Sequence, residues 1–473
     1  MKFFLTSFMI LFSLRGVFAQ EKQVFNLEEC IDYAALNAVT MQNAILDQEI
    51  AVAKVKETIG IGLPQITGSV GLQHSPTLAR FFGTYQPGSP FGVDAATASQ
   101  LGIQPGDVFA AKNFFQLQSA GDAKLSVQQL IFNGSYLVGL QASNAYKDLS
   151  VRQANQTKEE IVLNVSKAYY NLLIMREQEK LIQSNIDRVD TLLFNTQALV
   201  ENGFAEKIDA DRLKVTLNNL KTEQLNLANM EKLSVRLLML QMNYPFDRPF
   251  QVSGELADVM VEAFDLPEQG DWSYNVRPDY QVFEANRKLQ QLNIKNKYAE
   301  GLPTIAAFAT LGRSTQSPDF NGLFQANSSF TEVEDQIGVD GWYDYSSVGL
   351  SLNWSIFTGL QRNFQIQQEK LELQKLENGF VALEKQIELE IQQSGIDQDN
   401  ALKQLSVQTE NKDLAEEIYN IAKIKYEEGV GSNLEVIEAN TSFKEAQTNY
   451  YSALYNAIIA QLELKKALGT LLN

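Results

Sequence analysis

The sequence contains the same helix-breaking turn twice, once in each half of the chain. In the second half, residues 426–439 (YEEGVGSNLEVIEA) follow a long helical pattern, are broken at Gly429 and Gly431, and then start another helix. Ser432 and Glu435 have the S-x-x-E spacing of a capping box, which predicts that this helix begins near Ser432. A glycine-broken reversal between two long helices predicts the tip of a helical hairpin.

The first half of the chain has a matching tip at residues 200–213 (VENGFAEKIDADRL). Gly203 and Asp209 stand there at the positions of Gly429 and Glu435. A repeat of half the chain predicts a tandem duplication whose halves form one body, rather than a row of separate globular domains. We therefore expect both tips at the same end of the molecule.

Composition argues against several classes of function. The formal net charge of −18 is unsuitable for nucleic acid, whose phosphates need a basic face. The chain has one histidine, His74, and one cysteine, Cys30, and we find no phosphate-binding loop or nucleophile elbow. Cys30 lies inside a helical pattern and is interpreted as ordinary helix packing. The sequence predicts neither an enzyme nor a metal or cofactor site.

Residues 1–19 have the features of a cleaved signal peptide. Lys2 is followed by an apolar run over residues 3–14 and by a small-x-Ala site at residues 17–19, which predicts cleavage before Gln20. No later segment approaches the ~20 apolar residues of a transmembrane helix. The mature chain is expected to be exported and to lack a membrane-spanning helix.

The first repeat is predicted over residues 20–243. Near its start, Ile66, Val70 and Leu72 alternate with small or polar residues, the period of a strand with one apolar face. The predicted elements are a helix over 27–59, strands over 64–73 and 122–132, and helices over 135–201 and 207–242. Residues 74–121 are predicted to be a long loop.

The second repeat is predicted over residues 278–473, after a mixed equatorial segment at 244–277 whose prolines exclude a long helix. Val348, Leu350 and Leu352 give its clearest strand alternation. The predicted elements are a helix over 278–299, strands over 303–311 and 345–357, and helices over 360–427 and 432–472. We expect the loop after residue 312, like the first long loop, to cap an outer mouth.

Strands of roughly ten residues with one apolar face, in an exported protein, are typical of outer-membrane barrels. Four strands cannot close a barrel, because an open edge in lipid leaves backbone groups unpaired and the smallest such barrels have about eight strands. Several copies must therefore share one barrel, and three would supply twelve strands. Long helices would continue its wall as a tube, so the sequence predicts an oligomeric duct.

The motifs of the two repeats resemble those of the outer-membrane efflux protein (TolC) family, over essentially the whole mature chain. The motifs are the two G-L-P strand starts, the I-F-N-G and I-F-T-G strand ends, the second tip with its LEVIEA, and the closing LKKALGTL. The resemblance implies a mixed α and β membrane protein: a homotrimer with a twelve-stranded outer-membrane barrel, four strands per chain, and a long periplasmic α-helical barrel. It further implies an exit duct in contact with outer-membrane lipid, which works with a periplasmic adaptor and an inner-membrane transporter in tripartite efflux or type I secretion.

The resemblance also implies a gate at the periplasmic end. Glu435 and Glu438 match the paired acids of the family's entrance constriction, with glutamate in place of aspartate, and their spacing puts both on one helix face. In a trimer, six carboxylates would crowd a narrow ring that attracts cations. The alternative for Glu435 is a purely stabilising role in the first turn of a helix, and for Glu438 an ordinary exposed acid.

A further pair, Asp209 and Tyr426, matches a hydrogen-bonded latch between the hairpins. Its alternative is a tyrosine packed at a helix end beside a solvated acid. Gly431 stands where a well-known member has an arginine of a second latch, which cannot form here. The tips are expected to contact the adaptor through Gly203, Phe204, Ala205, Glu206, Gly429, Val430, Gly431 and Ser432; Phe204 alternatively folds back on its own hairpin.

Two other classes of membrane-associated protein remain as alternatives. A passive porin would have most of its residues in strands, whereas most of this chain is predicted to be helical. A trimeric coiled-coil stalk or adhesin anchored in the outer membrane would favour an unbroken heptad pattern over paired hairpins. The identity of the cargo, of the pump and of the adaptor does not follow from the sequence.

Overall fold

The computed structural model describes residues 24–89, 92–113, 116–256, 259, 261, 272–325 and 341–472. The predicted signal peptide, much of the equatorial segment and part of the second long loop lie outside these residues. The chain divides into two compact units. The helical unit comprises residues 1–52, 145–290 and 371–473, and the sheet unit comprises residues 53–144 and 291–370.

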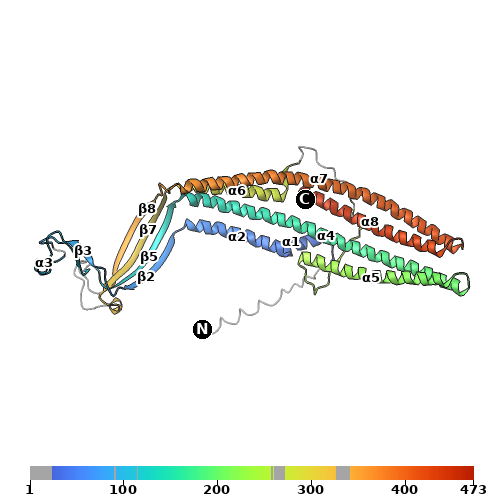
Figure 1. Cartoon of the computed structure of the whole chain (residues 1–473), viewed down its shortest axis with the longest axis horizontal. Helices are drawn as coiled ribbons and strands as arrows, with labels where there is room; N and C mark the ends of the chain where they lie inside the picture. The colour runs from blue at the N-terminus through green and yellow to red at the C-terminus, as the bar shows by residue number, and fades with distance from the viewer. Residues whose placement is uncertain are drawn as a thin grey trace, which may run out of the picture. The chain divides into compact units, whose positions relative to one another are not determined.

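The sheet unit is built on four antiparallel strands in the order β2-β5-β7-β8 (Figure 1). Their bounds are β2 Gln65–His74, β5 Ser119–Phe132, β7 Thr304–Ser317 and β8 Tyr343–Asn353. The central pair joins the two sequence repeats, since Leu125 of β5 lies opposite Leu311 of β7. The outer strands β2 and β8 form the two edges of this sheet.

One face of the sheet is apolar and the other is polar. The register aligns Ile66, Val127, Ala309 and Val348 in one row across the four strands, and Val348 is 87% exposed. The neighbouring row on the other face contains Thr67, Ser126, Thr310 and Ser347. Residues opposite each other in a ladder share a face, so the predicted alternation extends across all four strands in these two rows. A further row on the apolar face contains the charged pair Arg313 and Asp344.

The strand ends differ from the predicted ones. β7 continues to Ser317 instead of ending at residue 311, because it pairs with the long strand β5 up to Ser119. β8 ends at Asn353, before the predicted end at residue 357. Just beyond β8, the Trp354 indole N–H donates to the carbonyl of Gly301 at 3.0 Å.

The segment predicted as a long loop over residues 74–121 contains regular structure. β3 Phe81–Thr84 pairs antiparallel with β4 Val108–Ala111, and α3 Ala95–Leu101 lies between them in sequence. The carboxylate of Asp94 caps α3 by accepting from the N–H groups of Ala96 and Thr97. A small core of Tyr85, Ala98 and Phe109 holds these pieces together. In the second long loop, a 3-10 turn, η3 Asn321–Phe324, follows β7.

The first predicted helix, 27–59, is two helices. α1 Leu27–Asn37 and α2 Val39–Ile61 are separated at Ala38, whose ψ of 134° is extended. A continuous helix would need the Asn37 carbonyl for its own ladder, but the side-chain amide of Asn243 donates to that carbonyl at 3.0 Å. A tertiary contact therefore accompanies a break that no proline or glycine signals.

The remaining helices form two hairpins and a shorter helix, α6 Pro278–Ala299. α4 Gly134–Glu201 and α5 Lys207–Met242 form the first hairpin, and α7 Gln361–Glu427 and α8 Asn433–Ala467 the second. Their tips, both in the helical unit, lie side by side (Figure 1). α8 stops five residues before the predicted end at 472, at a turn where Gly469 has a φ of 71°.

The core of the helical unit lies where α1, α4 and α5 meet. Val165 and Leu172 of α4 and Leu238 and Met242 of α5 are almost completely buried there. Cys30 of α1 joins this core, and burial raises the pKa of its thiol to about 12. A two-residue parallel pair, β1 Val24–Phe25 with β6 Gln251–Val252, and a 3-10 turn, η2 Tyr274–Val276, complete the described part of the equatorial segment.

No helix within the described parts of the chain has a run of apolar residues long enough to cross a membrane.

Candidate functional site: the hairpin tips

The two tips are closed by the same backbone hydrogen bonds. At the first, Gly203 N–H donates to the Val200 carbonyl and Phe204 N–H to the Leu199 carbonyl. At the second, Gly429 N–H donates to Tyr426 and Val430 N–H to Lys425. Gly203 and Gly429 have φ values of 79° and 75°, the left-handed conformation that favours glycine.

Each tip exposes one large apolar side chain directly after its glycine. Phe204 is 81% exposed and Val430 is 80% exposed. Phe204 therefore does not fold back onto its own hairpin, which was one of its two interpretations. Exposed apolar side chains at a turn are a feature of surfaces that a partner covers.

Gly431 has no room for a side chain. A Cβ atom at this position would lie 2.9 Å from the Cβ of Lys425 and 3.1 Å from its carbonyl carbon. The Gly431 N–H donates to the carbonyl of the same Lys425 at 2.9 Å. The turn thus excludes the arginine that occupies this position in a well-known member of the family.

The start of α8 presents two carboxylates. Glu435 and Glu438 are both exposed, whereas Val436 and Ala439 beside them are buried. Ser432 Oγ accepts from Glu435 N–H at 3.2 Å, which is the Ser432 half of the predicted capping box. Neither carboxylate makes an ion pair with any residue that the structure describes. Both are therefore free to face a ligand or a further copy of the chain.

The predicted Asp209–Tyr426 hydrogen bond is not formed. Tyr426 Oη instead lies 2.8 Å from Thr196 Oγ1 of α4, and this bond connects the two hairpins. Asp209 lies on α5, where its carboxylate is 3.8 Å from Arg212 Nη1. Only its backbone carbonyl contacts the other hairpin, by accepting from the Asn433 side chain at 3.2 Å.

Thr196 was missed by the sequence analysis, although the pattern contains a signal for it. Its position continues the buried seam of Ile182, Ile186, Val189 and Leu193 in steps of three and four residues. A fully buried hydroxyl in such an apolar seam needs a partner. The partner itself lies about half the chain away and follows only from the packing of α4 against α7.

Arg188 is a second residue that the sequence did not single out. Its guanidinium carbon lies 5.5 Å from the centre of the Tyr419 ring and 5.1 Å from that of Phe443, and its Nε donates to Asn440 Oδ1 at 3.3 Å. Its Nη2 is buried and has no hydrogen-bond partner among the described residues. Burial lowers the pKa of this guanidinium from its usual value.

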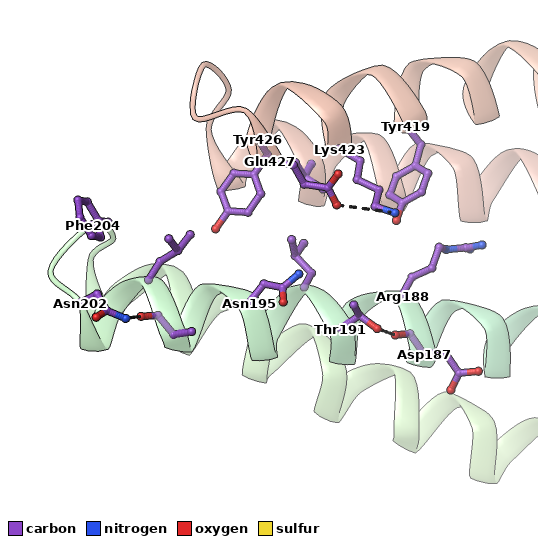
Figure 2. A pocket seen from close by; sticks show the side chains of 14 residues that line it. Asp187, Arg188, Thr191, Asn195, Asn202, Phe204, Tyr419, Lys423, Tyr426 and Glu427 are labelled. Atoms are coloured by element: carbon purple, nitrogen blue, oxygen red, sulfur yellow. Dashed lines mark hydrogen bonds and ion pairs between the residues drawn. The ribbon is translucent and has the colours of Figure 1, made fainter.

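A cavity of about 680 Å³ lies between the two hairpins near their tips (Figure 2). Arg188 and Asn195 of α4 and Asn202 just beyond its end line one side, and Tyr419 and Tyr426 of α7 line the other. Phe204 of the first tip and Val436 of α8 also contribute to the wall. The cavity therefore combines aromatic rings and amides with two cations, Arg188 and Lys423, and two carboxylates, Asp187 and Glu427.

Comparison with known proteins shows a similarity to one family. The sequence model of the outer membrane efflux proteins matches residues 275–470, which include the second tip with Glu435 and Glu438. Outer membrane protein TolC of Escherichia coli is 22% identical to this chain, with 97% of this chain and 85% of that protein covered. The chain is similar to the outer membrane efflux proteins in sequence and in fold.

Further relatives and solved structures give the same similarity. A probable efflux pump outer membrane protein, TtgC of Pseudomonas putida, is 23% identical, with 70% of this chain and 64% of that protein covered. The open state of the Neisseria gonorrhoeae MtrE outer membrane channel superposes with a TM-score of 0.69 at 18% identity, covering 94% of this chain and 89% of that one. The Campylobacter jejuni CmeC outer membrane channel superposes with a TM-score of 0.66 at 16% identity, covering 94% of this chain and 86% of that one.

The outer membrane efflux protein family has a defined class and location. Its members are channels of the outer membrane of Gram-negative bacteria that extend into the periplasm, and they are not enzymes. No group of acidic, histidine or cysteine side chains that is suited to a metal ion is found in the described parts of the chain.

Proposed function

We propose that this protein is the outer-membrane exit duct of a tripartite efflux or type I secretion system. The single observation that carries the proposal is the four-stranded sheet, with its apolar face, its polar face and its two edge strands β2 and β8. In lipid, unpaired edges are costly, and pairing β8 of one copy with β2 of the next removes them. Three copies then give a twelve-stranded barrel with a polar lumen.

The duct closes at an acidic gate. In a homotrimer, Glu435 and Glu438 of each chain contribute to one ring of six carboxylates at the tube's periplasmic end. The exposure of both side chains and the burial of Val436 and Ala439 beside them support this arrangement. A ring of this kind attracts cations and repels anions. The Tyr426–Thr196 hydrogen bond, rather than Asp209, holds the two hairpins of each chain together in the closed state.

The tips dock on a periplasmic adaptor that connects the duct with an inner-membrane transporter. The exposed Phe204 and Val430 supply an apolar contact of the kind that a partner covers. The other tip residues, Gly203, Ala205, Glu206, Gly429, Gly431 and Ser432, form the surrounding backbone surface. The transporter supplies the energy, and the duct itself uses no cofactor.

Single-channel conductance in a planar bilayer tests the duct and its gate together. The wild type is compared with the Glu435→Gln/Glu438→Gln variant. The control is Glu410→Gln/Asp413→Asn, which removes two acids at the same three-residue spacing from the exposed surface of α7. We expect a small, cation-selective conductance whose selectivity is lost only in the Glu435/Glu438 variant.

The other results separate the parts of the proposal. A channel that is equally selective in all three proteins keeps the duct and rejects the acidic gate. If a trimeric preparation forms no channel at all, the duct itself is rejected and the stalk becomes the better interpretation.

A further inference from the structure

The cavity between the hairpins contains a positive charge, that of Arg188, which makes no direct ion pair within the described chain. Among its other charged residues, Lys423 Nζ lies 3.8 Å from Glu427 Oε1, and Asp187 accepts from the Gln183 side chain at 2.8 Å. Within the described chain, Arg188 donates to the neutral amide of Asn440, and the charge of Glu416 acts on it without forming an ion pair. An anion inside the cavity would therefore meet one unmatched cation.

The surroundings of Arg188 keep it in place instead of releasing it to water. Tyr419 and Phe443 both lie within 6 Å of its guanidinium, at the distances of cation–π contacts. Nη2 is buried without a partner, although a buried charged group normally has one. The burial that lowers the pKa of this guanidinium shows that the cation is under-solvated. A counter-charge at this point is worth more than the same charge at an open surface.

The size and lining of the cavity indicate what kind of anion fits. Its volume of about 680 Å³ lies within the range of roughly 300–1,000 Å³ that small-molecule sites occupy. Apart from Arg188, the wall offers the rings of Tyr419, Tyr426 and Phe204 and the aliphatic side chains of Leu192 and Leu199. Figure 2 shows the tyrosines and Arg188 reaching into the same space from α7 and from α4.

We propose that this cavity is a binding site for a small aromatic anion. Its carboxylate or sulfonate group lies toward Arg188, and its ring packs among the tyrosines and leucines of the wall. The site is built between the hairpins of one chain, and neither Glu435 nor Glu438 lines it. One molecule binds per chain.

Equilibrium dialysis of radiolabelled 2-naphthoate against the full-length protein in detergent tests the site, with detergent alone as the blank. We expect saturable binding in the wild type and at least tenfold weaker binding in Arg188→Gln. Arg236→Gln is the matched control, since Arg236 also stacks on a ring, that of Phe246 at 5.2 Å, but does not line the cavity. The neutral isostere 2-naphthamide should compete at least tenfold more weakly than unlabelled 2-naphthoate.

A second variant keeps the arginine and removes the space. Ala198 lines the cavity, and Ala198→Trp should abolish binding while the thermal unfolding curve by circular dichroism stays that of a folded protein. Equal binding of 2-naphthoate by the wild type and by Arg188→Gln overturns the proposal. So does full binding in Ala198→Trp, or equal competition by the amide. If Arg188→Gln does not fold, the Ala198→Trp result and the comparison with the amide decide the question alone.

Discussion

Glu159 is a buried carboxylic acid in α4, where burial makes the charged form of its side chain unfavourable. Its side chain is 6% exposed, and its Oε1 has no hydrogen-bond partner within the described chain. Burial raises the pKa of this carboxyl to about 7, and the negative charge of Asp279 is the second cause of the increase. The nearby Arg277 is already held by Asp279 and Glu390, at 2.7 Å and 2.9 Å.

The protein should therefore lose stability as the pH rises through the Glu159 titration. Between the ordinary pKa of 4.5 and about 7, the folded state holds a proton that the unfolded state has lost. The folded state is thus favoured at low pH, and this contribution disappears by about pH 7. Glu159→Gln keeps the neutral shape and should be more stable than the wild type by roughly 1–3 kcal/mol at pH 8, and equal to it at pH 4.

Thermal unfolding at the two pH values measures this difference. The neighbouring acid Glu160 is exposed, so Glu160→Gln should match the wild type at both. A gain in stability for Glu159→Gln that is the same at pH 4 and pH 8 would contradict the explanation.

At the scale of helices, α4 and α7 are joined near the tips by one hydrogen bond between two side chains. Thr196→Val and Tyr426→Phe each remove the Thr196–Tyr426 bond, so each should weaken the contact between hairpins by about 1 kcal/mol. The double variant should cost little more than either single one, because both remove the same bond. We expect faster hydrogen exchange in residues 191–204 and 419–431.

Asp209→Asn is the control for this bond, since the Asp209 carboxylate contacts Arg212 and not Tyr426. It should leave exchange at both tips unchanged. Strictly additive effects of the two substitutions, or an Asp209→Asn effect as large as that of Tyr426→Phe, would show that the bond does not join the hairpins.

The long helices are the elements that sequence periodicity predicts best. α4 begins at Gly134 and α7 ends at Glu427, within one residue of the predicted bounds, because glycine turns flank uninterrupted apolar periodicity. The tips could be located for the same reason. Periodicity carries no comparable information on which residues meet across hairpins, so Thr196 and Arg188 were not found.

Short elements and local breaks depend on contacts that no local pattern contains. The break at Ala38 accompanies a contact from Asn243, more than 200 residues later. β3, α3 and β4 have four to seven residues each and are stabilised by the small core around Phe109. The segment has the composition of a loop, but the side chains of Tyr85, Ala98 and Phe109 pack together and stabilise its short elements.

At the scale of the whole molecule, the proposed trimer makes a prediction about the edges of the sheet. Thr67 of β2 and Ser347 of β8 lie on the polar face, at the two edges. A scan of cysteine pairs around these two positions should give disulfide-linked trimers on non-reducing gels, because β8 of one copy pairs with β2 of the next. The native Cys30 is buried and does not interfere.

Ser126→Cys in the central strand β5 is the control and should give no cross-linked species, since both neighbours of β5 come from its own chain. Cross-linking that stops at dimers, or that is absent over the whole scan, would exclude the shared barrel.

The pairing of β5 with β7 also determines when the sheet can form during synthesis and export. The two strands meet as Leu125 against Leu311, so β5 lacks its second neighbour until most of the chain has been made. Pairings this distant in sequence are slow to form, and an apolar strand with an open edge is prone to aggregate meanwhile. A folding factor that shields such strands in the periplasm must therefore protect β5 for longest. The protection is needed until β7 of the second repeat is available to pair with β5.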